Sequence, residues 1–171
     1  MIRSQLTAML GTLLLGGLLP LAVAAPDAGE AAPDFALPGY TGSNVRLSEY
    51  RGEVVVLTFW SSRCGQCAQQ LAALDQLQST YRSAGLVTLA VGIDDDETRA
   101  AEFARSHDWR IPLLKDRDKQ VGRAYGVDRL PTTVLIDRSG HVRYRFRDYR
   151  STQSDYLMQL RALLDDSDAG K

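Results

Sequence analysis

Cysteine and histidine are scarce in this sequence, whose 171 residues include two of each. So few cysteines exclude a small fold held together by several disulfides, and any cysteine chemistry must use the one pair. A zinc site of the Cys2His2 type would need all four residues, and His107 and His141 lack the close spacing of such sites. We therefore expect no metal site.

An excess of charge of one sign is also missing. The chain has 20 Lys and Arg residues against 21 Asp and Glu residues, without a basic block. Because binding to phosphate backbones needs clustered cations, nucleic acid is not expected as a partner. The sequence also lacks internal repeats and a linker able to separate two domains. With 44% hydrophobic residues it predicts one globular domain, which we expect to be a monomer.

The one long apolar run lies at the N-terminus. Arg3 is the only charged side chain before an apolar run at 6–19, and small residues occupy positions 22 and 24. This pattern is typical of a secretory signal peptide, so we expect cleavage after residue 24 and a periplasmic protein. An uncleaved N-terminal anchor is the alternative, because the uncharged stretch is just long enough to span a bilayer. We expect a flexible leader at 25–32, the folded domain at 33–166 and a frayed tail at 167–171.

Apolar patterning predicts alternating strands and helices. Residues 54–60 form a nearly continuous β-branched and aromatic run, which predicts a central strand buried on both faces. Leucines at helical spacing predict a helix from about Cys64 to Gly85. The remaining patterns predict a hairpin-like start at 35–37 and 44–47, strands at 86–93, 111–114, 133–136 and 142–147, and helices at 94–107, 118–125 and after a cap at Ser151 or Thr152. This order indicates an α/β fold with a single sheet between helices.

The two cysteines follow the predicted central strand directly, as Cys64-Gly65-Gln66-Cys67. This spacing places the sulfurs one helical turn apart, close enough to form and break a disulfide. At a helix N-terminus the unpaired N–H groups and the helix dipole stabilise an anion, so Cys64 should become a thiolate at lower pH than free cysteine. Cys67, inside the first turn, should be the shielded sulfur that resolves a mixed disulfide.

Other interpretations of the pair stay open. It could be a permanently closed structural disulfide, since export leads to an oxidising compartment. It could also deliver copper(I), because thiolates are soft ligands, although the sequence offers no methionine cluster or third soft ligand.

Two segments resemble a known family. FWSSRCGQC at 59–67 is similar to the FWAxWCGPC segment of thioredoxin-like proteins, and GVDRLPTTVLIDRSG at 126–140 is similar to their stretch around a cis-proline. With APDF at 32–35 and LSEYRG at 47–52, the sequence resembles the exported TlpA/ResA branch of thiol-disulfide oxidoreductases. The resemblance implies a thioredoxin-like fold, a central mixed sheet flanked by helices with a short N-terminal β extension. It implies no cofactor beyond a redox-active Cys64–Cys67 disulfide.

The same resemblance assigns roles by position. It implies that Cys64 is the nucleophile, Cys67 the resolving thiol and Pro131 a cis-proline. A cis bond would place Leu130 beside the dithiol, where its backbone could pair with an extended client segment, and Leu130, Pro131 and Thr132 are the expected substrate-binding residues. The expected clients are proteins bearing thiols or disulfides. The implied role is a reductant in cytochrome c maturation or copper-site assembly, fed by a membrane dithiol electron-transfer protein, while the oxidase direction stays open.

Five residues should tune the pair: Thr58, Trp60, Arg63, Gly65 and Gln66. Arg63 stands where the family usually has Trp, and an adjacent cation favours a thiolate, although water and salt screen an exposed guanidinium. Gln66 replaces a proline. Trp60 could shield the sulfurs or fill the core.

No carboxylate is expected beside the resolving cysteine. Thr58 stands where thioredoxin has a buried Asp, and Gln70 stands where the family has a Glu. We therefore predict that Cys67 lacks a protein base and that mixed disulfides last longer than in thioredoxin. A thiol peroxidase is a further alternative, because the opening at 33–35 also occurs in peroxiredoxins. Their threonine two residues before a lone cysteine is absent, since Ser61 lies three residues before Cys64.

Overall fold

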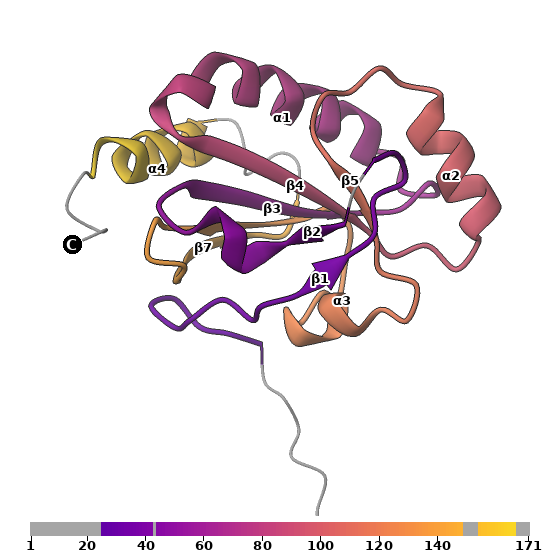
Figure 1. Cartoon of the computed structure of the whole chain (residues 1–171), viewed down its shortest axis with the longest axis horizontal. Coiled ribbons are helices and arrows are strands. Elements are labelled where there is room, and N and C mark those ends of the chain that lie inside the picture. Colours follow the sequence, from indigo (N-terminus) through magenta and orange to yellow (C-terminus); the bar gives the residue numbers. More distant parts are fainter. Residues whose placement is uncertain (1–24, 43, 149–153, 167–171) are drawn as a thin grey trace, which may run out of the picture.

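A computed structural model of the chain describes residues 25–42, 44–148 and 154–166 (Figure 1). Its main sheet has five strands in the order β5-β4-β3-β6-β7. The central strand β3 (Val54–Trp60) is parallel to β4 (Leu86–Gly92) and antiparallel to β6 (Thr132–Ile136). The edges are β5 (Leu113–Lys115) and β7 (Val142–Phe146). The predicted α/β fold with a mixed sheet is confirmed.

Strand β3 lacks an apolar–polar alternation because both of its faces are covered. All seven of its residues are buried. Successive side chains of a strand point to opposite faces. Val56 and Trp60 therefore join the apolar cluster under the first helix, and Leu57 and Phe59 join the cluster on the other face. This continuous apolar run is what a strand between two layers requires.

Helices cover one face of the sheet and a mixed layer covers the other. The first face carries α1 (Cys67–Tyr81), which continues into the 3-10 turn η2 (Arg82–Ala84), together with α2 (Glu97–Arg105) and α4 (Ser154–Asp165). The second carries α3 (Gln120–Ala124) and the N-terminal β1 (Ala36–Leu37), β2 (Val45–Arg46) and η1 (Leu47–Tyr50). Figure 1 shows α1 and α4 above the sheet and β1, β2 and α3 below it.

The N-terminal β extension is present, since β1 and β2 pair antiparallel. The expectation of a flexible leader at 25–32 is wrong for the described chain, because this segment is bound to the turn between β6 and β7. Its backbone hydrogen bonds run from Gly29 N–H to the Val142 carbonyl (2.7 Å), from Val142 N–H to the Glu30 carbonyl (2.8 Å) and from Ala32 N–H to the Gly140 carbonyl (2.9 Å). Pro26 and Ala32 are also buried, so the segment is part of the domain.

The same N-terminal region reaches the opposite edge of the sheet. The Tyr40 N–H donates to the Leu113 carbonyl and the Lys115 N–H donates to the Pro38 carbonyl, both at 2.8 Å. Part of β5 is therefore paired on its outer side. The expected signal peptide at 1–24, the helix caps at Ser151 and Thr152, and the tail at 167–171 lie outside the described residues.

A buried carboxylate organises the turn between β6 and β7. Asp137, whose side chain is 5% exposed, accepts hydrogen bonds from His141 N–H (2.9 Å) and Ser139 Oγ (2.7 Å) and pairs with Arg143 (3.1 Å). Burial raises the pKa of Asp137, but these three donors outweigh burial and hold the pKa below its ordinary value. The turn thus depends on an ionised carboxylate.

Candidate active site

The two cysteines lie just beyond the carboxyl end of β3 and form a disulfide. Their sulfurs are 2.12 Å apart and their Cα atoms are 5.4 Å apart. The segment before the helix is a turn, in which Cys64 N–H donates to the Ser61 carbonyl and Cys67 N–H donates to the Cys64 carbonyl. Helix α1 therefore begins at Cys67, three residues later than the sequence predicted. Cys64 precedes the first helical turn and stands at its N-terminal end.

The two sulfurs differ in access to solvent. Cys67 is 1% exposed and packs in the apolar cluster beneath α1, while Cys64 is only partly buried. A second molecule can therefore approach Cys64 more readily than Cys67. This is the asymmetry expected for an attacking sulfur and a shielded, resolving one.

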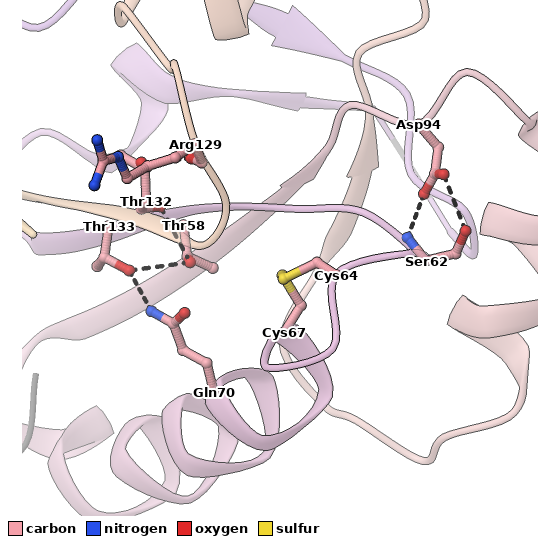
Figure 2. The surroundings of a disulfide bond; sticks show 9 residues. All are labelled: Thr58, Ser62, Cys64, Cys67, Gln70, Asp94, Arg129, Thr132 and Thr133. Atoms are coloured by element: carbon pink, nitrogen blue, oxygen red, sulfur yellow. Dashed lines mark hydrogen bonds between the residues drawn. A yellow bond between two sulfur atoms is a disulfide. The ribbon is translucent and has the colours of Figure 1, made fainter. Parts of the chain in front are cut away.

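An aspartate holds the turn that precedes Cys64. The Asp94 carboxylate accepts hydrogen bonds from Ser62 N–H (2.5 Å) and Ser62 Oγ (2.9 Å), as Figure 2 shows. This contact follows from the sheet: β3 and β4 are parallel and paired from Val54–Leu86 to Trp60–Gly92, so the residues after them leave the same edge together. Asp94 thus fixes the position of the turn relative to β4.

A chain of hydrogen-bonded, buried polar groups lies beside the two cysteines, on the α1 face of the sheet. Gln70 Nε2 donates to Thr133 Oγ1 (2.5 Å), Thr133 Oγ1 is 3.1 Å from Thr58 Oγ1, and Thr58 Oγ1 donates to the Thr132 carbonyl (3.4 Å). Figure 2 shows this chain beside the disulfide. Thr58, Gln70 and Thr133 are at most 3% exposed. The polar groups of this chain are hydroxyls, an amide and a backbone carbonyl, so none of its members is a carboxylate.

Trp60 fills the core next to the pair. It is fully buried, stacks on Phe103 with ring centroids 4.9 Å apart, and contacts Tyr40 at 5.6 Å. Gly92 permits this packing, because a Cβ atom there would lie 3.0 Å from both the indole ring and the Tyr40 hydroxyl. Burial, with the charges of Asp94 and Glu97, raises the pKa of Tyr40 to about 12. Trp60 is therefore a packing residue that shares the cysteines' cluster.

The loop before β6 carries the other predicted site residues. The Leu130–Pro131 peptide bond is cis, in agreement with what the resemblance implied. Leu130 is partly exposed and packs against the apolar cluster that includes Cys64, whereas Pro131 is buried. Thr132 is 1% exposed and its hydroxyl donates to the Arg129 carbonyl (2.8 Å). Its side chain is therefore not available to a client, which leaves Leu130 as the accessible member of the expected substrate-binding trio.

Arg63, Gly65 and Gln66 are exposed around Cys64. A cleft of about 260 Å³ is lined by Arg63, and its lining also includes Asp94, Lys119, Arg129 and Leu130. Cations and carboxylates both line the cleft, so its charge is not of a single sign. Among the described residues, no group of three or more His, Cys, Asp and Glu side chains could hold a metal ion.

The five-stranded sheet and the Cys-x-x-Cys disulfide at the end of its central strand define a thioredoxin-like protein. The chain belongs to the AhpC/TSA family, whose model matches residues 28–145. It is 38% identical over 115 residues to the thiol-disulfide oxidoreductase ResA of Geobacillus thermodenitrificans, and as similar to ResA of Geobacillus kaustophilus. Each alignment covers 67% of this chain and 66% of the relative, so the match spans just under two thirds of these relatives.

Solved structures agree with the fold. A protein described as thiol:disulfide interchange protein DsbE from Chlorobium tepidum superposes with a TM-score of 0.78 at 36% identity, covering 82% of this chain and 99% of that chain. The exposed lipoprotein thioredoxin Etrx1 of Streptococcus pneumoniae gives a TM-score of 0.69 at 28% identity, covering 77% and 100%. The thioredoxin-like fold and the ResA-like relationship inferred from sequence are confirmed.

Two contacts of the site do not follow from the local sequence patterns. Asp94 was expected only near a helix start, although its position directly after a strand parallel to β3 could have indicated a contact with the turn at Ser62. Thr133 lies opposite Thr58 because of the antiparallel register of β6, which local patterns do not determine.

Proposed function

We propose that this protein is an exported thiol-disulfide oxidoreductase that reduces disulfides in client proteins. One observation carries the proposal: an accessible Cys64 is joined to a 1%-exposed Cys67 at the end of the central strand. The homologous ResA proteins, named thiol-disulfide oxidoreductases, support it.

The reaction uses both sulfurs in turn. The Cys64 thiolate attacks one sulfur of the client disulfide, and the other client sulfur leaves with the electron pair of the broken bond and takes a proton from solvent. The Cys67 thiolate then attacks the Cys64 sulfur, which forms the Cys64–Cys67 disulfide and releases the second client thiolate. Two electrons pass to the client. A dithiol reductant must then reduce the pair again.

The client is proposed to bind along the loop that ends at the cis-proline. Leu130 is partly exposed there, so its backbone could pair with an extended client segment beside Cys64. We further propose that the reductant is a membrane dithiol protein and that the clients are apocytochromes c or copper-site proteins. The protein is proposed to act as a monomer.

The proposal that the protein is exported rests on its N-terminal sequence. We propose that residues 1–24 direct the chain to the periplasm and are removed. Among the residues that the structure describes, no helix is long and apolar enough to cross a membrane. Mass spectrometry of the protein from periplasmic and membrane fractions would identify the mature N-terminus. Recovery of the intact N-terminus in the membrane fraction alone would support the uncleaved anchor instead.

Trapping of mixed disulfides tests the mechanism. A Cys67→Ser variant should accumulate client proteins linked to Cys64, because the second attack is lost, and these partners can be identified by mass after non-reducing electrophoresis. Cys64→Ser is the matched control and should trap far fewer, since Cys67 is buried. Equal trapping by the two variants would contradict the assigned order of attack.

Three assays on the purified wild-type protein separate the alternatives. An exchange enzyme should reduce insulin with dithiothreitol as electron source, whereas a closed structural disulfide should not. A copper carrier should bind copper(I) tightly and fail in the insulin assay. A peroxidase should consume hydrogen peroxide faster than it reduces insulin, and we expect the reverse.

A further inference from the structure

Gln70 combines burial with an unsatisfied acceptor next to the resolving cysteine. It is 3% exposed, and its Oε1 atom has no hydrogen-bond partner among the described residues. Gln70 follows Cys67 by three residues on α1, so the two side chains lie on the same face of the helix. Figure 2 shows the amide with its oxygen on the side of the disulfide and its nitrogen turned toward Thr133.

The orientation of the amide follows from the hydrogen-bond chain. An amide nitrogen can only donate, so Thr133 Oγ1 accepts from Gln70 Nε2 and has its own proton free for Thr58 Oγ1. Thr58 in turn donates to the Thr132 carbonyl. In this direction each of the two threonine hydroxyl protons is used once. The amide nitrogen is thereby committed to Thr133, and Oε1 is left as an acceptor that needs a donor.

The disulfide cannot supply that donor, because its sulfurs carry no protons. A buried acceptor without a partner costs free energy in this oxidised state. On reduction by a dithiol, the S–S bond breaks, two electrons and two protons pass to the protein, and Cys67 gains an S–H group, which is a weak donor. We propose that Gln70 Oε1 accepts this S–H hydrogen bond, so that Gln70 selectively stabilises the reduced form of the pair.

Water is the competing donor. Gln70 also lines a pocket of about 490 Å³ between α1 and α4, with Leu74 and Tyr156 among its other lining residues. A water molecule there could satisfy Oε1 equally in both redox states. In that case Gln70 would contribute to folding without affecting the redox equilibrium, which makes the two possibilities separable.

The test is the reduction potential of the full chain, measured in dithiothreitol redox buffers by thiol alkylation. Gln70→Met keeps the side-chain length but removes both polar atoms. It should shift the equilibrium toward the disulfide by about three- to tenfold, since the reduced form loses a hydrogen bond and the oxidised form loses an unsatisfied acceptor. Gln69→Met is the matched control on the exposed side of α1 and should leave the potential unchanged.

A second readout observes the bond directly. In Cys64→Ser the only thiol is Cys67, and its S–H infrared band should move to higher frequency when Gln70 is also changed to Met. An unchanged potential and an unchanged S–H band would overturn the inference while leaving the exchange mechanism intact. The inference rests on the proposed redox cycling, and a wild-type disulfide that resists reduction across the whole buffer series would instead contradict the proposed function.

Discussion

The prediction that Cys67 lacks a protein base can be tested by supplying one. Thr58 is 1% exposed, and Figure 2 includes it in the surroundings of the disulfide. In Thr58→Asp, the new carboxyl group could accept a hydrogen bond from Thr133 and, when protonated, donate to the Thr132 carbonyl, as the present hydroxyl does. Burial and this bond to the neutral form should both raise the pKa of the new group.

The loss of stability in Thr58→Asp can be calculated from the difference between the folded and unfolded pKa values of the new carboxyl group. An unfolded Asp has a pKa of about 3.9, so a folded pKa of about 7 or higher costs up to about 4 kcal/mol of stability at pH 7. Because the folded pKa is raised, the loss is absent below pH 4 and grows as the pH rises. Urea unfolding of the disulfide-bonded variant at pH 4 and pH 7 measures it. Thr88→Asp is the control, since Thr88 is equally buried two residue pairs further from the site on β4.

The same substitution should accelerate the release of the client, although it lowers the stability of the protein. Once ionised, the carboxylate introduced by Thr58→Asp can take the proton of Cys67, and general bases typically contribute 10²- to 10⁴-fold. Stopped-flow measurements of client release from the mixed disulfide at pH 8 should therefore show an acceleration of about tenfold or more, absent in Thr88→Asp. If the variant shows the pH-dependent loss of stability but releases its client no faster than wild type, the lack of a base does not limit resolution.

Three further predictions concern Arg63, the contact between Asp94 and Ser62, and Asp137. Arg63→Gln should move the pH profile of Cys64 alkylation by less than about 0.3 pH units, because an exposed guanidinium is screened; a shift of a full unit would show that Arg63 controls the thiolate. Asp94→Ala should lower the free energy of unfolding by about 2 kcal/mol and Ser62→Ala by about 1 kcal/mol, and in urea titrations the double variant should lose less than their sum, because both remove one shared interaction. Asp137 has a lowered folded pKa, so its contribution is complete above its unfolded pKa of about 4 and is lost as the pH falls further, through the lower folded pKa; the stabilities of wild type and Asp137→Asn should therefore approach each other as the pH falls below about 4, and a constant difference from pH 7 to pH 2 would contradict this.

Local patterns were sufficient for most of the architecture. The uninterrupted apolar run at 54–60 predicted the central strand, and the structure places β3 over the same residues. The disulfide partners were also accessible to sequence reasoning, because a Cys-x-x-Cys spacing after a buried strand constrains both sulfurs locally.

The errors arose where distant contacts outweigh local composition. The small and polar residues at 25–32 have the composition of a leader, but their backbone groups find partners in the turn before β7, more than 100 residues away in the sequence. Helix α1 begins at Cys67, and not near Cys64 as predicted, because the residues from Ser61 to Cys64 form a turn. The chain through Gln70 and Thr133 joins residues 63 apart, which only the register of β3 and β6 brings together.

The N-terminal region has a further consequence for a protein that is proposed to be exported. Residues 29–32 bond to the start of β7 and residues 38–40 bond to β5, so one continuous stretch of chain occupies part of both outer strands. Exposed outer strands are sites where copies of a protein add to one another and aggregate. In a folding chain whose residues 29–40 have not yet bonded to β5 and β7, both outer strands would be exposed. Self-association should therefore be greatest at that stage of folding.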